Sequence, residues 1–163
     1  MTMNDIILEQ VIEKDIPQLH ALQVESFMPL YNKYHDEGSP AIEPMEKLRN
    51  KVLLPERQYY FIVKYGIRIG AIGIEDWSSK ANRSVFYISP IFIIPSWQDK
   101  GLGYAAMQQA LNLHPEATEW YLTTILQEPR NCHFYEKCGF VRTGGSRVIN
   151  DMLTLVDYAL IRE

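Results

Sequence analysis

The sequence is poor in cysteine, has no block of like charges and contains no long apolar run. Cys132 and Cys138 are its only cysteines, and the N-terminal MTMNDIILEQ lacks the pattern of a signal peptide, so we expect free thiols in a reducing compartment. The net charge of −4 argues against nucleic acid and anionic membranes as partners. No apolar run approaches the roughly 20 residues of a membrane span. These absences favour a cytoplasmic protein.

Two common ligand-binding patterns are also missing. Cys132, His133 and Cys138 contain no C-x-x-C pair and no second cluster, so we expect no metal ion. Lys100 precedes Gly101 and no Gly-Lys-Ser or Gly-Lys-Thr follows, which excludes a P-loop nucleotide site. The chemistry of this chain is therefore expected to depend on neither.

The chain is long enough for one domain, and its 47% hydrophobic content can fill a core. Hydrophobic periodicity and turn residues predict strands over 6–11, 59–63, 68–77, 85–94 and 120–126, two more strands at the C-terminus, and helices from Asp15 to about 27, over 46–54, after Gly103 and over 130–137. Residues 28–43 and 78–83 are predicted to be irregular. We expect a single domain over 1–163 with an α/β (α+β) fold, in which a mixed, mostly antiparallel sheet is flanked by helices.

The most informative stretch runs from residue 91 to residue 113. An apolar strand ends at Pro95, a turn contains Gly101 and Gly103, and a helix follows. This helix is predicted to bury a stripe made of Leu102, Ala106, Ala110 and Leu113. Free N–H groups and the helix dipole favour an anion at such a helix start, and glycines let a phosphate approach. Anion binding and a purely structural role for the glycines both remain open on this pattern alone.

Two segments resemble the GNAT family of N-acetyltransferases. Residues 95–103, PSWQDKGLG, are similar to the family's [Q/R]-x-x-G-x-[G/A] turn after its fourth strand. Residues 134–140, FYEKCGF, are similar to its F-Y-x-K-x-G-F segment, and one predicted strand separates the two segments as in the family. The resemblance implies a sheet split in a V between the fourth and fifth strands, with acetyl-CoA in the split.

The resemblance also implies which residues bind acetyl-CoA. Backbone groups of Phe92 and Ile93 would pair with the pantetheine arm, and Pro90 would help to leave them free. The pyrophosphate would rest on the turn formed by Gln98, Asp99, Lys100, Gly101, Leu102, Gly103 and Tyr104. Where the family often has an asparagine seven residues before its tyrosine, this chain has Glu128, and Asn131 is the candidate substitute.

Tyr135 is the predicted catalytic residue, because a phenol beside the leaving CoA thiolate can protonate it. The structural alternative is a core tyrosine whose hydroxyl is satisfied elsewhere. Glu75 and Asp76 end the strand over 68–77, which borders the reaction centre in this family. Alternation allows one of them to face inward, and Glu75 is our candidate base, although either carboxylate could be a solvated strand end.

Aromatic and acidic residues near Tyr31, Tyr34 and Asp36 are candidates for the acceptor site, together with Asp76. Carboxylates and aromatic rings would suit a cationic amine, although a solvated loop explains the composition equally well. The resulting hypothesis is an acetyl-CoA-dependent N-acetyltransferase that moves an acetyl group directly to a primary amine of a small molecule or peptide. The alternative is a catalytically silent acyl-CoA-binding sensor or scaffold. A homodimer is compatible with either.

Overall fold

The computed structural model describes residues 5–162 of the chain. One seven-stranded sheet in this part of the chain has the order β1-β2-β3-β4-β5-β7-β6. The strands are β1 (Ile7–Gln10), β2 (Arg57–Lys64), β3 (Ile67–Asp76), β4 (Val85–Ile93), β5 (Glu119–Ile125), β6 (Val141–Asn150) and β7 (Leu153–Ile161). The helices are α1 (Ile16–Tyr34), α2 (Met45–Val52), α3 (Ser78–Ala81), α4 (Leu102–Asn112) and α5 (Pro129–Lys137), with 3-10 turns at Glu13–Asp15, Pro40–Ile42 and Pro95–Trp97.

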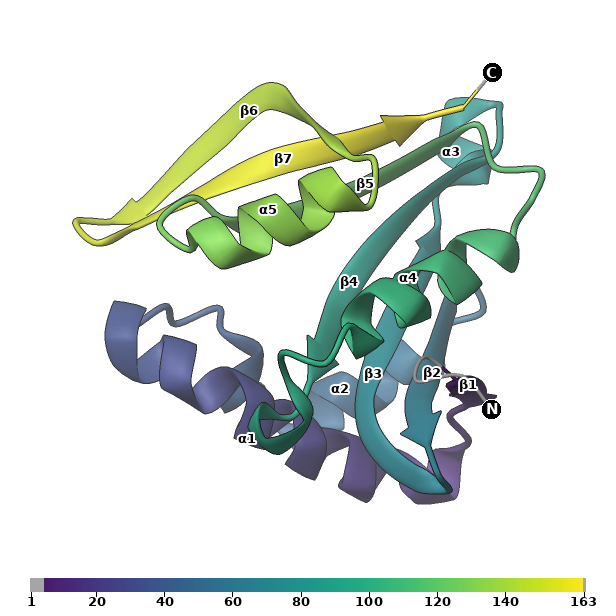
Figure 1. The fold of residues 1–163 in the computed structure, drawn as a ribbon, viewed down its shortest axis with the longest axis vertical. Coiled ribbons are helices and arrows are strands. Elements are labelled where there is room, and N and C mark those ends of the chain that lie inside the picture. Colours follow the sequence, from purple (N-terminus) through teal and green to yellow (C-terminus); the bar gives the residue numbers. More distant parts are fainter. Residues whose placement is uncertain (1–4, 163) are drawn as a thin grey trace.

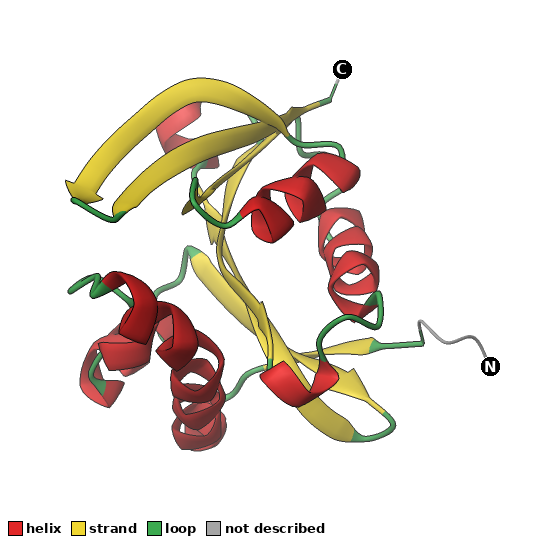
Figure 2. Cartoon of the chain, turned by 60° about the vertical axis from the view of Figure 1, so that its left-hand side comes forward, coloured by secondary structure: helices red, strands yellow, loops and turns green. Residues whose placement is uncertain are grey.

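The sheet is antiparallel except where β4 meets β5. These two parallel strands pair only at their first residues, Val85–Tyr87 of β4 with Glu119–Tyr121 of β5. Beyond this point they diverge, as Figure 1 shows. Helices α1 and α2 cover one face of the sheet, and α4 and α5 cover the other (Figure 2). The predicted fold class and the V-shaped split are thereby confirmed.

Close backbone contacts between β3 and β4 shape the strand beside the split. A Cβ atom at Gly70 would lie 2.1 Å from the carbonyl oxygen of Phe92, and one at Gly73 would lie 2.4 Å from that of Ser89. The pairing shifts register between Ile72 and Ile74, opposite the segment that contains Pro90. This register shift is a β-bulge beside Pro90, and the two glycines of β3 allow β4 to pass this close.

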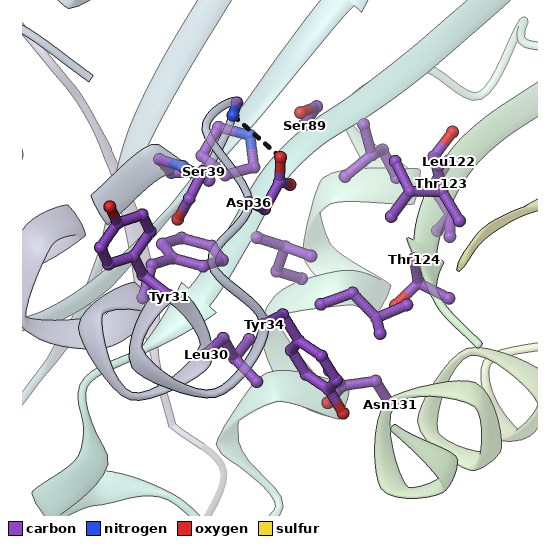
Figure 3. A pocket seen from close by; sticks show the side chains of 18 of the residues that line it. Leu30, Tyr31, Tyr34, Asp36, Ser39, Ser89, Leu122, Thr123, Thr124 and Asn131 are labelled. Atoms are coloured by element: carbon purple, nitrogen blue, oxygen red, sulfur yellow. Dashed lines mark hydrogen bonds between the residues drawn. The ribbon is translucent and has the colours of Figure 1, made fainter. Parts of the chain in front are cut away.

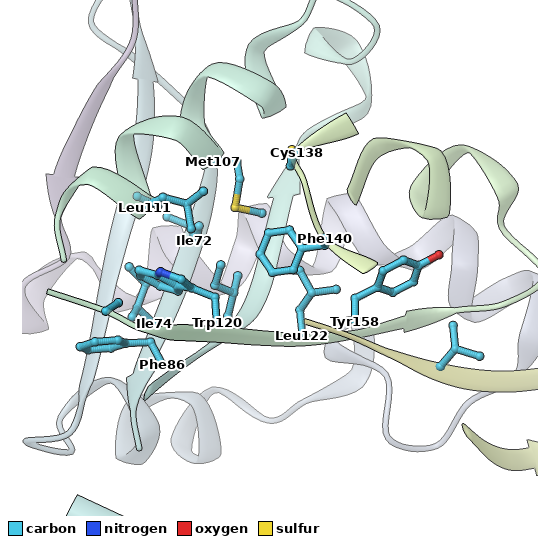
Figure 4. Packing of buried hydrophobic residues seen from close by; sticks show 14 residues of the cluster. Ile72, Ile74, Phe86, Met107, Leu111, Trp120, Leu122, Cys138, Phe140 and Tyr158 are labelled. Carbon is cyan, nitrogen blue, oxygen red and sulfur yellow. The ribbon is translucent and has the colours of Figure 1, made fainter. Parts of the chain in front are cut away.

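The largest core cluster joins the two arms of the V beneath α4 and α5. Trp120, Tyr158 and Met107 are fully buried there, and Phe140 is 2% exposed (Figure 4). A second cluster packs α1 and α2 onto β2 and β3, and it includes Ile16, Leu19, Leu48 and Phe61. Because both arms are held by apolar packing, the divergence of β4 from β5 is a fixed feature of the fold.

Three expectations about elements were wrong. Helix α1 does not end near residue 27 but continues through Pro29 to Tyr34. Pro29 and Glu25 are both exposed, so the carbonyl that loses its N–H donor lies on the solvent side of the helix. Burial of Tyr34, 4% exposed, supports the last turn of the helix.

The other two corrections concern residues 78–81 and the buried face of α4. Residues 78–81 form helix α3 rather than an irregular loop. Leu113 does not join the buried stripe of α4, because this helix ends at Asn112 and leaves the side chain 42% exposed. Met107 and Leu111 are buried on α4 instead. No helix within residues 5–162 is long and apolar enough to cross a membrane.

Candidate active site

A cavity of about 310 Å³ lies where β4 and β5 part. Its walls come from α1 and the loop after it, β4, β5, α5 and the two C-terminal strands (Figure 3). The predicted site residues among those that line it are Tyr31, Tyr34, Asp36, Asn131 and Tyr135. The fold therefore brings the predicted acceptor segment and the predicted catalytic tyrosine to one cavity.

Tyr135 lines this cavity from α5. Its ring lies 5.1 Å from that of Phe134 and 6.4 Å from that of Phe140, centroid to centroid, whereas its hydroxyl makes no hydrogen bond to another described residue. Burial raises the pKa of the Tyr135 phenol well above its usual range. The hydroxyl thus keeps its proton at neutral pH and can donate it to a group bound in the cavity.

One edge of β4 offers backbone groups to the same space. Within the described residues, β5 pairs with β4 only as far as Tyr87, so residues 88–93 have no strand partner on that side. On the other side Phe92 pairs with Ala71 and Ile93 with Gly70. The side chain of Phe92 is buried against Phe27, with ring centroids 5.4 Å apart. The exposed β4 edge could therefore hold an extended ligand as an added strand.

The turn from β4 to α4 has the features of an anion site. Asp99 and Gly101 are in the left-handed region, with φ of 65° and 76°. Ala105 is the first residue of α4 whose N–H reaches a carbonyl of the turn, that of Gly101 at 3.3 Å. The N–H of Gln98, which was expected to bind the pyrophosphate, donates instead to the carbonyl of Pro95 at 3.3 Å. The N–H groups of residues 99–104 have no backbone acceptor among the described residues. Such unpaired N–H groups at a helix start suit a pyrophosphate.

Three residues of this turn make contacts within the protein as well as being candidates for binding the pyrophosphate. A Cβ atom at Gly103 would contact the ring of Phe134 at 3.4 Å, so this glycine fits α4 against α5. The side-chain amide of Gln98 donates to the carbonyl of Ile93 at 2.8 Å, and the carboxylate of Asp99 pairs with Arg130. Arg130, which the sequence did not single out, thus places a cation beside the turn.

Glu128 links the end of α1 to the start of α5 through hydrogen bonds. Its carboxylate accepts hydrogen bonds from the Tyr34 hydroxyl at 2.5 Å and from the Lys33 ammonium at 2.7 Å. Burial acts to raise the pKa of Glu128, but the hydrogen bonds from Lys33 and Tyr34 outweigh it and hold that pKa below its usual value. The residue that departs from the family pattern is therefore a structural link, and Asn131 remains the amide that lines the cavity.

Neither carboxylate at the end of β3 lines the cavity. Glu75 pairs with Arg57 at 3.2 Å, and Asp76 accepts the N–H of Ser78 at 2.8 Å. Glu75 lies opposite Tyr87 in the sheet register. The structure therefore does not bring the candidate base Glu75 or the candidate substrate residue Asp76 together with Tyr135.

A second hollow of about 500 Å³ adjoins the cavity and was not anticipated. Tyr87, Thr123 and Arg147 line both spaces, whereas Asp157 and Trp77 line only the second. Pairing of β4 with β5 and of β5 with β7 assembles this group from distant parts of the chain. The alternation of side chains along a strand predicts which face of the sheet each residue occupies. It does not predict which strands lie side by side, so the sequence could not show that these residues share one hollow.

A sheet that parts between parallel fourth and fifth strands, with unpaired N–H groups at the following helix, defines an acyl-CoA-binding acetyltransferase fold. The model of the Acetyltransferase (GNAT) family matches residues 17–140 of this chain. The chain belongs to the GNAT acetyltransferase family, a family that uses acyl-CoA.

Individual relatives are more distant. The spermidine N(1)-acetyltransferase of Vibrio cholerae is 26% identical over 152 residues, which span 87% of this chain and 83% of that protein. The structure of the Vibrio cholerae spermidine N-acetyltransferase with CoA and spermine has a TM-score of 0.74 at 20% identity and covers 96% of this chain and 95% of that one. A Salmonella typhimurium acetyl transferase that modifies the N-terminal serine of ribosomal protein L7/L12 has a TM-score of 0.75 at 16% identity, with coverages of 97% and 95%. The two structural matches show a shared fold.

Proposed function

We propose that this chain transfers the acetyl group of acetyl-CoA directly to a primary amine. The observation that carries the proposal is the hydroxyl of Tyr135, which lines the cavity between β4 and β5 and has no hydrogen-bond partner within residues 5–162. A protein that only bound acyl-CoA would need the turn and the open strand edge but no proton donor beside the thioester.

Different groups of the chain would bind acetyl-CoA and donate the proton. The N–H groups of residues 99–104 would hold the pyrophosphate, and the free edge of β4 over residues 88–93 would hold the pantetheine arm. The amine nitrogen forms a bond to the thioester carbonyl carbon, the C–S bond breaks, and Tyr135 gives its proton to the departing thiolate. Burial raises the pKa of Tyr135, so the phenol carries its proton when the thiolate forms, and the developing negative charge on sulfur provides the drive for its transfer.

The acceptor would enter from the side of α1. Tyr31 and Asp36 line that wall of the cavity, and Asp36 is held by the N–H of Gly38, 2.8 Å from its Oδ1 atom. A carboxylate beside aromatic rings favours a cationic amine. Spermidine, named for the Vibrio cholerae relative, and a protein N-terminus, named for the Salmonella typhimurium protein, both present a primary amine. We therefore propose a small-molecule or peptide amine as the acceptor.

A screen of acceptors tests the proposed function. The purified chain is incubated with acetyl-CoA and, in turn, spermidine, a neutral primary amine and a short peptide with a free N-terminus, and the release of free thiol is measured. Amine-dependent thiol release is the expected result. Acetyl-CoA that raises the melting temperature while no amine provokes thiol release would instead establish the silent sensor.

A further inference from the structure

Three side chains from three strands form a continuous hydrogen-bonded path out of the cavity. The hydroxyl of Tyr87 on β4 lies 2.9 Å from Thr123 Oγ1 on β5, and Thr123 Oγ1 lies 2.9 Å from Asp157 Oδ1 on β7. Tyr87 and Thr123 line the cavity that contains Tyr135, whereas Asp157 lines the adjoining hollow. The path therefore links the reaction space with a second opening.

The chemistry of the three groups sets the direction of both hydrogen bonds. An ionised carboxylate has no proton and can only accept, so Thr123 must donate its single proton to Asp157. Thr123 can then only accept from Tyr87, and the phenolic proton of Tyr87 is used in that bond. The oxygen of Tyr87 is left with lone pairs, so it can accept an N–H from an amine in the cavity.

The other carboxylates near this space have partners. Glu128 accepts from Tyr34 and Lys33, and Glu75 pairs with Arg57. Asp36 lines the cavity, but one of its oxygens holds the N–H of Gly38 in the loop after α1. Asp157 is the carboxylate joined to the cavity wall through a chain of hydroxyl groups.

The surroundings of Asp157 leave room for its carboxylate and give it access to solvent. Its side chain is half-buried, and a Cβ atom at Gly145 would lie 2.4 Å from its Oδ2 atom. The other titratable or charged groups that line the hollow are Tyr87, Tyr121 and Arg147, from β4, β5 and β6. The hydroxyl of Tyr121 donates to Glu119 at 2.5 Å, so it is already engaged elsewhere.

Building on the proposed function, we propose that Tyr87 accepts a proton of the acceptor ammonium and that Thr123 and Asp157 relay it away. As the ammonium proton moves to the oxygen of Tyr87, the phenolic proton moves to Thr123 and the hydroxyl proton of Thr123 moves to Asp157. The net change is one proton transferred from the ammonium to the carboxylate, which leaves a neutral amine to attack the thioester. Asp157 then releases the proton to water in the hollow. Tyr87 is the catalytic residue of this path, and Thr123 and Asp157 are positioning residues.

Thr123→Val is the sharpest test, because it interrupts the path while Tyr87 and Asp157 stay in place. With an acceptor found in the screen, we expect kcat/KM to fall about 100-fold near pH ~7 and less than about tenfold near pH ~9.5, where more of the amine is already neutral in solution. Asp157→Asn and Tyr87→Phe should give similar pH profiles. The double variant of Thr123→Val and Tyr87→Phe should be no slower than the worse single variant, because one break already interrupts the path.

Thr118→Val is the matched control. It makes the same chemical change just before β5, where the Thr118 hydroxyl donates to the Ser84 carbonyl at 3.1 Å and lines neither cavity. Melting temperature and acetyl-CoA affinity, measured for every variant, should stay close to wild type. An active wild type with unchanged Thr123→Val kinetics, or with an equal loss at every pH, overturns the relay alone. A larger pH-dependent loss in Asp36→Asn than in Asp157→Asn also overturns it. A wild type that acetylates no amine overturns the proposed function together with the relay.

Discussion

The two sides of the cavity present different chemical groups: one presents main-chain groups and the other presents side chains. The side proposed for acetyl-CoA consists of main-chain groups: the free edge of β4 over residues 88–93 and the unpaired N–H groups of residues 99–104. The side proposed for the acceptor consists of side chains, among them Tyr31, Asp36 and Tyr87. A cosubstrate common to a family can be bound by a backbone that many sequences adopt, whereas an acceptor must be selected by particular side chains.

The supports of the two sides also differ. Close contacts of Gly70 and Gly73 with the backbone of β4 fix the acetyl-CoA side. On the acceptor side, the end of α1 is fastened by polar contacts: Tyr34 donates to Glu128, and the amide of Asn150 donates to the carbonyl of Tyr34 at 3.0 Å. Side chains on such a wall can be replaced without moving the sheet. The comparison teaches that substitutions on the first side should alter acetyl-CoA binding, and those on the second should alter acceptor choice.

The largest effect is expected where the two sides meet, at Tyr135. Tyr135→Phe deletes the hydroxyl and keeps the ring packed against Phe134 and Phe140. Because general acid catalysis contributes about 10²- to 10⁴-fold, kcat should fall by that order in steady-state assays, with little change in acetyl-CoA affinity.

Stability separates the catalytic role of Tyr135 from a packing role. The hydroxyl has no partner among the described residues, so the melting temperature of Tyr135→Phe should stay near that of wild type. Tyr65→Phe, at an exposed turn, is the matched control and should leave kcat unchanged. A kcat of Tyr135→Phe within twofold of wild type, measured where chemistry limits turnover, would remove the phenol from the mechanism.

The acetyl-CoA side is tested by adding one methyl group to the turn. Gly101 and Gly66 have nearly equal φ values, 76° and 75°, so Gly101→Ala and Gly66→Ala should carry similar strain of about 1–2 kcal/mol. Only Gly101 lies among the N–H groups proposed to hold the pyrophosphate. In calorimetric titrations we expect about tenfold weaker acetyl-CoA binding for Gly101→Ala, roughly 1.4 kcal/mol, and wild-type affinity for Gly66→Ala. Equal affinities would make this turn purely structural.

The contrast between main-chain groups and side chains explains how much of the site the sequence could predict. The glycine turn and the FYEKCGF segment are each contiguous, so they could be compared with the family's motifs, and that resemblance implied the V-shaped sheet. Tyr87, Thr123 and Asp157 belong to separate strands, and their contact depends on the register of β4 with β5 and of β5 with β7. Glu75 illustrates the same limit, because its position at a strand end could not reveal its ion pair with Arg57.

A smaller effect concerns the ionisation of Tyr135. Burial raises the pKa of its phenol well above its usual range, so Tyr135 should remain protonated near pH ~10, where a free tyrosine is half ionised. The near-ultraviolet absorbance of phenolate, compared between wild type and Tyr135→Phe, should show no difference below that pH. Because the unfolded chain loses this proton first, the contribution of Tyr135 to the unfolding free energy should stay constant below about pH 10 and fall above it. A difference in phenolate absorbance near neutral pH would contradict this expectation.

The smallest effect tests whether the acceptor wall selects charge. Asp36→Asn removes a negative charge, and the Asn side-chain oxygen can still accept the N–H of Gly38 that lies 2.8 Å from Asp36 Oδ1. Because Asp36 is half-exposed, a pair with a cationic acceptor is worth only about 0.5–1 kcal/mol, so KM for spermidine should rise about two- to fivefold while KM for a neutral amine stays unchanged. Asp151→Asn, an equal loss of charge at the exposed turn between β6 and β7, controls for the net charge of the protein. Added salt should weaken the effect of Asp36→Asn, because screening already reduces the attraction in wild type. An equal rise in KM for both amines would mean that Asp36 shapes the loop after α1 without recognising charge, and selection would then depend on the groups around Asp157.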